Sequence, residues 1–137
     1  MWWIYALLSA LFAALTAIFA KLGVKNIDSD LATAIRTIII LILAWAIVLF
    51  KGSMQSIQML SKQNWLFLVL SGCATGFSWI FYFKALQVGK VSLVAPVDKL
   101  SVALAIILSA LFLGETITLK TALGAALIIA GTFVLIL

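Results

Sequence analysis

Four charged side chains lie inside otherwise apolar stretches of this sequence, namely Arg36, Lys84, Asp98 and Lys99. A charged side chain within a membrane span costs about 2.5–3.5 kcal/mol on insertion scales, so each one needs a physical reason. Lys84 and Arg36 lie near segment ends, where a long side chain can reach the headgroups; for Arg36 a role in a site is an equal alternative. Asp98 is too short for this, and we expect it to meet a cation, a polar cavity or a proton. A purely structural ion pair of Asp98, with Arg36 or with Lys99 of a neighbouring chain, is the alternative.

Small polar side chains accompany these charges at helical spacing. Asp98, Ser101 and Ser109 fall on one helical face, and a second stripe consists of Ser71, Thr75, Ser78 and Tyr82. Two facing polar stripes in an apolar bundle favour a translocation cavity, although Ser and Thr also hold membrane helices together. The candidates for substrate or proton binding are therefore Asp98, Lys99, Arg36, Ser101, Tyr82 and Ser78.

Pro96 is the only proline and lies within the same apolar segment as Asp98. Because proline has no N–H, it cannot bond to the carbonyl of Ser92, and we expect a kink or a free acceptor just before Asp98. Interrupted helices that line a cavity are typical of transporter binding sites.

The composition excludes most kinds of active site. The chain has no histidine and one cysteine, so metal, haem and nucleophile–base constellations lack their usual side chains. We expect no enzyme, no cofactor and no metal site. Nine Lys and Arg stand against four Asp and Glu, but the basic residues are scattered singly between apolar runs. This pattern is typical of residues that flank membrane spans and not of nucleic-acid binding.

The elements that must position these residues are membrane-spanning helices. Of the 137 residues 66% are hydrophobic and 9% charged, whereas a soluble domain is about half apolar and a quarter charged. Each of five apolar segments is long enough to cross a bilayer, and they cover about 2–20, 31–50, 65–86, 91–113 and 119–137. The sequence predicts an all-α integral membrane protein, a single domain over 1–137 built as a five-helix bundle.

Connections between these segments are short, and the longest covers residues 51–64, where a short interfacial helix or a plain loop is expected. The second and fourth segments start on the face where the third ends. The four intramembrane charges therefore lie in one half of the membrane and can form one ionic cluster.

Glycines mark candidate packing faces. Gly72 and Gly76 form a GxxxG match, and Gly124 and Gly131 share one face of the last segment. Such faces let helices approach closely, either within the bundle or between two chains.

The C-terminal half carries a resemblance to a known family. The stretch from Val94-Ala95-Pro96-Val97 to Leu113-Gly114-Glu115, followed by the Gly-rich segment 124–131, resembles the EamA-like branch of the drug/metabolite transporter superfamily. The resemblance implies a transporter that works by alternating access. Most members fuse two five-helix units into ten spans, and this chain is one such unit, half of the inverted-repeat transporter. The span-one acid of the small multidrug exporters is missing here, which argues against export of organic cations.

An odd number of spans has a consequence for assembly. Two directly fused five-helix units would have opposite orientations, so separate chains reproduce that pair only by inserting both ways. Three lysines lie on the N-terminal face (Lys51, Lys62 and Lys120), and five basic residues lie on the other (Lys21, Lys25, Arg36, Lys84 and Lys90). This weak bias permits dual topology, so we expect a homodimer, antiparallel, with a parallel dimer or a heterodimer as alternatives.

We therefore expect a transporter of a small metabolite in the bacterial inner membrane, coupled to protons or facilitative. Its partners are membrane lipid, a small-molecule substrate and a second chain, with no nucleic acid. Up to three cations against one acid within the membrane favour an anionic or zwitterionic substrate. The alternatives are a lipid-carrier flippase subunit and a non-transporting assembly or regulatory subunit.

Overall fold

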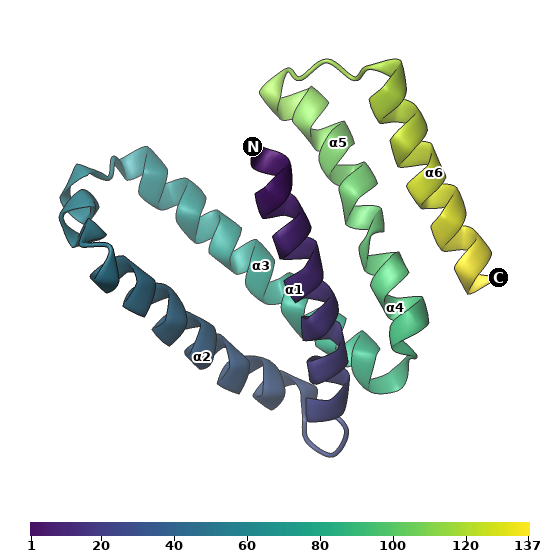
Figure 1. The fold of residues 1–137 in the computed structure, drawn as a ribbon, viewed down its shortest axis with the longest axis horizontal. Helices are drawn as coiled ribbons and strands as arrows, with labels where there is room; N and C mark the ends of the chain where they lie inside the picture. Colours follow the sequence, from purple (N-terminus) through teal and green to yellow (C-terminus); the bar gives the residue numbers. More distant parts are fainter. The chain divides into compact units, whose positions relative to one another are not determined.

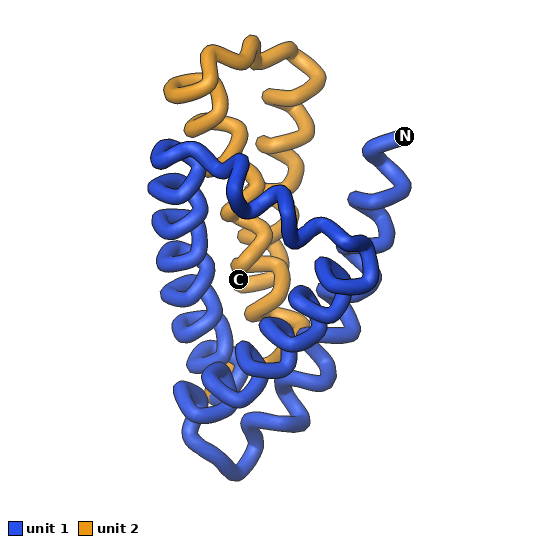
Figure 2. Tube along the Cα trace, turned by 90° about the vertical axis from the view of Figure 1, so that its left-hand side faces the viewer, with its two compact units in different colours: residues 1–87 blue, residues 88–137 orange.

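The protein is described by a computed structural model that covers residues 1–137. Every element is helical: α1 (Trp2–Gly23), α2 (Ser29–Phe50), η1 (Ser53–Met59), α3 (Lys62–Val88), α4 (Val91–Asp98), α5 (Leu100–Leu113) and α6 (Leu119–Ile136). Five helical stretches are long and apolar enough to cross a membrane, with α4 and α5 together forming the fourth. This confirms the predicted all-α fold with five membrane-length helices. The chain forms two compact units, residues 1–87 and 88–137 (Figure 2).

Two helices begin two or three residues before their predicted bounds because polar side chains cap them. Asp28 accepts hydrogen bonds from the backbone N–H groups of Asp30 and Leu31, so α2 begins at Ser29. The Ser61 hydroxyl accepts from the N–H of Asn64 in the same way, at the start of α3. Such caps satisfy N–H groups that have no partner within the helix.

In the first unit, α1, α2 and α3 converge where α1 ends, α2 begins and α3 ends (Figure 1). Nearly all buried residues of this unit lie there, and they include Ala17, Ala20, Val24, Phe83 and Leu86. The alanines allow α1 to approach its neighbours closely. Most large apolar side chains elsewhere in the unit are exposed, as expected for helices that face lipid.

Two polar side chains tie the end of α1 to the end of α3. The Lys21 ammonium donates to the carbonyl oxygen of Leu86 at 2.6 Å and to that of Gln87 at 3.4 Å. The Gln87 side-chain amide donates to the carbonyls of Ile27 at 2.8 Å and Val24 at 3.4 Å. The last carbonyls of a helix have no partner within it, so Lys21 supplies donors that α3 itself lacks.

Replacing Lys21 by Met should destabilise this junction. The substitution keeps most of the apolar stem and removes the ammonium that bonds to Leu86, and we expect a loss of about 1–2 kcal/mol in unfolding free energy. Reversible unfolding by SDS in mixed micelles measures it. Lys25→Met is the control because Lys25 is exposed. Equal stability of the two variants would contradict a structural role for Lys21.

The connection between α2 and α3 contains a short helix, as one of the two sequence interpretations proposed. It is η1, a 3₁₀-helix that follows Gly52, whose φ of +67° is easily adopted only by glycine. This short helix lies against α2.

The second unit is a helical hairpin in which α5 and α4 pack against α6 (Figure 1). Gly114 ends α5 with a φ of +68°, and the Thr118 hydroxyl caps α6 by accepting from the N–H of Thr121. Gly114 belongs to the Leu-Gly-Glu turn of the family resemblance, and the positive φ gives a physical reason for glycine there.

Candidate functional site

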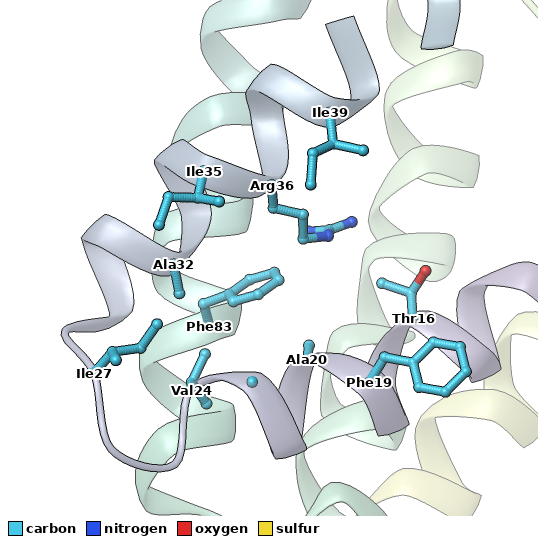
Figure 3. A pocket seen from close by; sticks show the side chains of 11 residues that line it. Thr16, Phe19, Ala20, Val24, Ile27, Ala32, Ile35, Arg36, Ile39 and Phe83 are labelled. Atoms are coloured by element: carbon cyan, nitrogen blue, oxygen red, sulfur yellow. The ribbon is translucent and has the colours of Figure 1, made fainter. Parts of the chain in front are cut away.

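Arg36 projects from α2 into a space lined by the three helices of the first unit (Figure 3). It lies seven residues after Ser29, or about 10 Å along the helix from its start. Its guanidinium carbon lies 4.8 Å from the centre of the Trp79 ring and 4.7 Å from that of Phe83. Trp79 and Phe83 are one helical turn apart on α3, so their rings together provide an aromatic surface for the cation.

The space around Arg36 is a cavity of about 360 Å³. Its walls come from α1, α2 and α3 and are almost entirely apolar, with Thr16 as the other polar side chain. Figure 3 shows the Arg36 and Phe83 side chains directed into this space, with Thr16 on the opposite helix. An apolar cavity with few polar groups is the usual form of a small-molecule site.

The neighbouring polar groups of the unit are occupied elsewhere. The hydroxyl groups of Thr33 and Thr37 donate to carbonyls one turn earlier on α2. The Asp30 carboxylate lies 3.6 Å from the Lys84 ammonium. The Nη1 atom of Arg36 is buried and has no hydrogen-bond partner. Arg36 therefore lies in the cavity without a carboxylate from its own unit.

The Lys84 side chain is exposed and its ammonium pairs with Asp30, and its extension toward the headgroups stays a prediction. Lys84 and Arg36 thus have different surroundings, one beside a carboxylate and one beside aromatic rings. A cluster that joins them to Asp98 stays a prediction.

Asp98 and Lys99 lie in the second unit, where α4 ends. The Lys99 ammonium donates to Asp98 at 3.3 Å, so the cation beside Asp98 belongs to the same chain. About one third of the Asp98 side chain is exposed, at 35%. Asp98 thus pairs with its direct neighbour in the sequence, and its role in substrate or proton binding stays a prediction.

The helix around Pro96 is interrupted at Lys99, after Asp98 and not before it. The Lys99 N–H donates to the Pro96 carbonyl, three residues back, in a tight turn. The buried Thr132 hydroxyl of α6 bonds to the Ile128 carbonyl at 2.8 Å and also lies 3.2 Å from the Pro96 carbonyl. The carbonyl of Pro96 is therefore the acceptor around which the two halves of the span are joined.

Other predicted binding residues have less distinctive surroundings. Ser101 and Ser78 are exposed, and Tyr82 is half-buried with its ring edge-on to Phe83 at 6.2 Å. The Thr75 hydroxyl donates to the Ser71 carbonyl within α3. A binding role for Ser101, Ser78 and Tyr82 stays a prediction.

Comparison with known proteins places this geometry in a family. The model of the EamA-like transporter family matches residues 1–137. The chain belongs to the EamA-like transporter family. This confirms the resemblance seen in the C-terminal half and extends it over the whole sequence. The protein is accordingly a multi-pass membrane protein of a transporter family.

Curated relatives of this EamA-like transporter differ in length. A Sinorhizobium protein described as an uncharacterized transporter in the cobO 3' region is 52% identical over 134 residues, covering 98% of this chain and 95% of the relative. The uncharacterized transporter YxxF of Bacillus subtilis is 30% identical over 129 residues, covering 93% of this chain and only 40% of the relative. An uncharacterized protein of Methanocaldococcus jannaschii is 30% identical over 132 residues, covering 96% of this chain and 93% of the relative. No solved structure matches.

The predicted packing glycines of this EamA-like chain have open surroundings. A methyl group added at Gly72, Gly76, Gly124 or Gly131 would meet no atom within 4 Å. The GxxxG face of α3 therefore packs against no helix of its own unit, and packing against a second chain stays a prediction.

The sequence alone indicates Arg36 as a candidate but does not indicate the residues around it. Trp79, Phe83 and Thr16 carry no charge and read as ordinary residues of apolar segments. The four-residue spacing of Trp79 and Phe83 is the one signal available, since it places two rings on one face of α3. The contacts of Lys21 and Gln87 could not be predicted from the sequence because their partners are 60 or more residues away.

Proposed function

We propose that this EamA-like chain transports a small metabolite by alternating access across the bacterial inner membrane, with two copies forming one transporter. The observation that carries the proposal is the difference in length among relatives. The chain spans nearly all of the Sinorhizobium relative but 40% of the Bacillus subtilis one, as expected if one chain supplies one of two units. Transporters built from two repeats place the substrate between them.

The two copies are proposed to have opposite orientations. Five spans put the two termini on opposite sides, so fusing two units in one chain inverts the second. Separate copies recover this arrangement by inserting both ways, and three against five basic residues on the two faces allow it. The open faces at Gly72 and Gly124 offer close approach for a second helix.

The substrate is proposed to be anionic or zwitterionic. The Arg36 cavity supports this because it combines a guanidinium with apolar walls in the membrane half where α2 begins. Further residues proposed to bind substrate or protons are Lys99, Ser101, Ser78 and Tyr82.

Uptake by reconstituted vesicles tests the proposal. Proteoliposomes are incubated with a mixture of carboxylic acids, amino acids and amines, and their contents are analysed by mass spectrometry. We expect time-dependent accumulation of at least one anionic or zwitterionic compound. Entry no faster than into protein-free vesicles for every compound would contradict a transport function.

Asp98 is proposed to couple transport to protons. Protonation would neutralise the carboxylate that holds Lys99 at 3.3 Å, so the ammonium would become available to an anionic substrate. Asp98→Asn mimics the protonated state, and we expect uptake that no longer responds to a pH gradient imposed across the vesicle membrane.

Glu115→Gln is the matched control for Asp98→Asn, since Glu115 is an exposed acid in the hairpin between α5 and α6. This control should keep the full response to the gradient. An unchanged pH response in Asp98→Asn would show that Asp98 has no part in coupling. The proposed transport function would not be contradicted by that result.

A further inference from the structure

We propose that the Arg36 cavity binds a monovalent oxyanion, a carboxylate or a phosphodiester, that is attached to an apolar body. The proposal names the substrate class for the transport function above. It rests on that function only in calling the ligand a substrate, because binding is measured without transport. Three features carry it: an unsatisfied donor, an unneutralised charge and apolar walls.

The unsatisfied donor is Nη1 of Arg36. This nitrogen is buried and has no partner, whereas buried polar atoms in folded proteins nearly always have one. Trp79 and Phe83 hold the guanidinium at 4.8 and 4.7 Å from their ring centres and offer only π faces. A guanidinium is planar, and its N–H groups form a fixed fork whose geometry matches the two oxygens of one anion.

The charge in the cavity is that of one cation. Asp28 caps α2, Asp30 pairs with Lys84, and the Lys21 ammonium bonds to the last carbonyls of α3. No other ionisable side chain of α1, α2 or α3 lines the cavity. One monovalent anion therefore neutralises the site, whereas a cation is repelled and a multiply charged anion leaves charge unpaired beside apolar walls.

The remaining lining specifies the rest of the ligand. Phe19, Val24, Ile35 and Ile39 contribute apolar side chains, and Thr16 contributes a hydroxyl. The volume of about 360 Å³ is within the range of cavities that hold small organic ligands. Because Thr16 is the one polar side chain of the walls besides Arg36, a strongly hydrated inorganic anion would lose most of its water without compensation, so the ligand needs an apolar part.

Three probes with one apolar body test the charge preference. They are 4-phenylbutyrate, 4-phenylbutan-1-ol and 4-phenylbutylammonium, titrated calorimetrically into the purified full-length protein in an uncharged detergent. We expect the anion to bind at least about tenfold more tightly than the alcohol, as one charge-assisted hydrogen-bond pair provides, and the ammonium to bind most weakly. Equal affinity for the acid and the alcohol would overturn the proposal.

Substitution of Arg36 tests the residue. Arg36→Gln should weaken phenylbutyrate binding about 10- to 100-fold and leave the affinity for 4-phenylbutan-1-ol unchanged. Lys25→Gln removes a positive charge from the same unit outside the cavity and should change neither affinity. Circular dichroism and gel filtration check the fold. Arg36→Lys keeps the charge without the planar fork and should give an intermediate loss of phenylbutyrate affinity; it replaces Arg36→Gln if that variant does not fold. Unchanged phenylbutyrate affinity in folded Arg36 variants would overturn the assignment.

A change of lipid distinguishes two sources of the oxyanion, a lipid phosphodiester and a free carboxylate. In maltoside micelles, which contain no phosphate, and in the same micelles with added phosphatidylglycerol, the phenylbutyrate affinity is compared for wild type and Arg36→Gln. Competition by phosphatidylglycerol in wild type only identifies a lipid phosphodiester as the occupant, and insensitivity identifies a free carboxylate; both support the proposal. If phenylbutyrate binds but no compound enters the vesicles, only the transport function is overturned. If phenylbutyrate does not bind and Arg36→Gln leaves metabolite uptake unchanged, only this inference is overturned.

Discussion

A variant of this protein biased into one membrane orientation is expected to be inactive alone and active when combined with an oppositely biased variant. The first carries Ser53→Lys and Gln55→Lys in η1 together with Lys25→Gln and Lys90→Gln, which moves the excess of basic residues to the N-terminal face. The second carries Lys51→Gln and Lys62→Gln, which strengthens the natural bias. All of these side chains are exposed, so the changes act on orientation and spare the packed junction.

The expected size of this effect follows from the architecture. If the substrate lies between two oppositely oriented units, a population with one orientation contains no complete transporter, and uptake should fall to that of protein-free vesicles. Mixing the two variants during expression restores the antiparallel pair. Orientation itself is read from the accessibility of a tag at each terminus.

A charge-balanced variant serves as the control. Lys51→Gln combined with Ser53→Lys alters the same connection but leaves the number of basic residues on that face unchanged. It should keep both orientations and full uptake. Full activity of either fixed variant alone would contradict the antiparallel pair and favour a parallel dimer or a partner chain of another kind.

Much of the fold was predictable because apolar length is a direct signal. A segment of about 20 apolar residues has few alternatives to a membrane helix, and all five predicted segments are helical in the structure. The bounds were less predictable, because they depend on caps such as that of Asp28 and not on hydropathy. Pro96 predicts a break before Asp98, but the break lies after Asp98, because the Lys99 N–H bonds to the Pro96 carbonyl three residues back in a tight turn.

The candidate site was predictable only in part. A charge within a span identifies itself, and Arg36 and Asp98 were found in this way. What surrounds such a charge depends on how each helix is rotated about its axis, which a single sequence does not encode in a readable form. Helix rotation decides both the pairing of Lys84 with Asp30 and the placement of the Trp79 and Phe83 rings around Arg36.

Phe83→Ala is expected to be the most destabilising single substitution in the first unit. The Phe83 side chain is 2% exposed and lies between the junction of the three helices and the Arg36 cavity, where it supports the guanidinium. Phe→Ala in a soluble core costs about 3–5 kcal/mol through transfer and cavity terms. In a bilayer the transfer term is small because lipid is itself apolar, so we expect about 2–3 kcal/mol, mostly from lost packing.

Phe81→Ala is the matched control, since Phe81 lies on the same helix two residues away and is 69% exposed. SDS-induced unfolding should separate the two variants clearly, with Phe81→Ala close to wild type. Phe83→Leu, which refills most of the space without restoring the ring, should recover stability but not the aromatic contact to Arg36. In Phe83→Leu we therefore expect recovered stability with weakened phenylbutyrate binding. That result would separate the packing role of Phe83 from its aromatic contact to Arg36. Equal stability of Phe83→Ala and Phe81→Ala would contradict the packed junction, because it would mean that Phe83 faces lipid as Phe81 does.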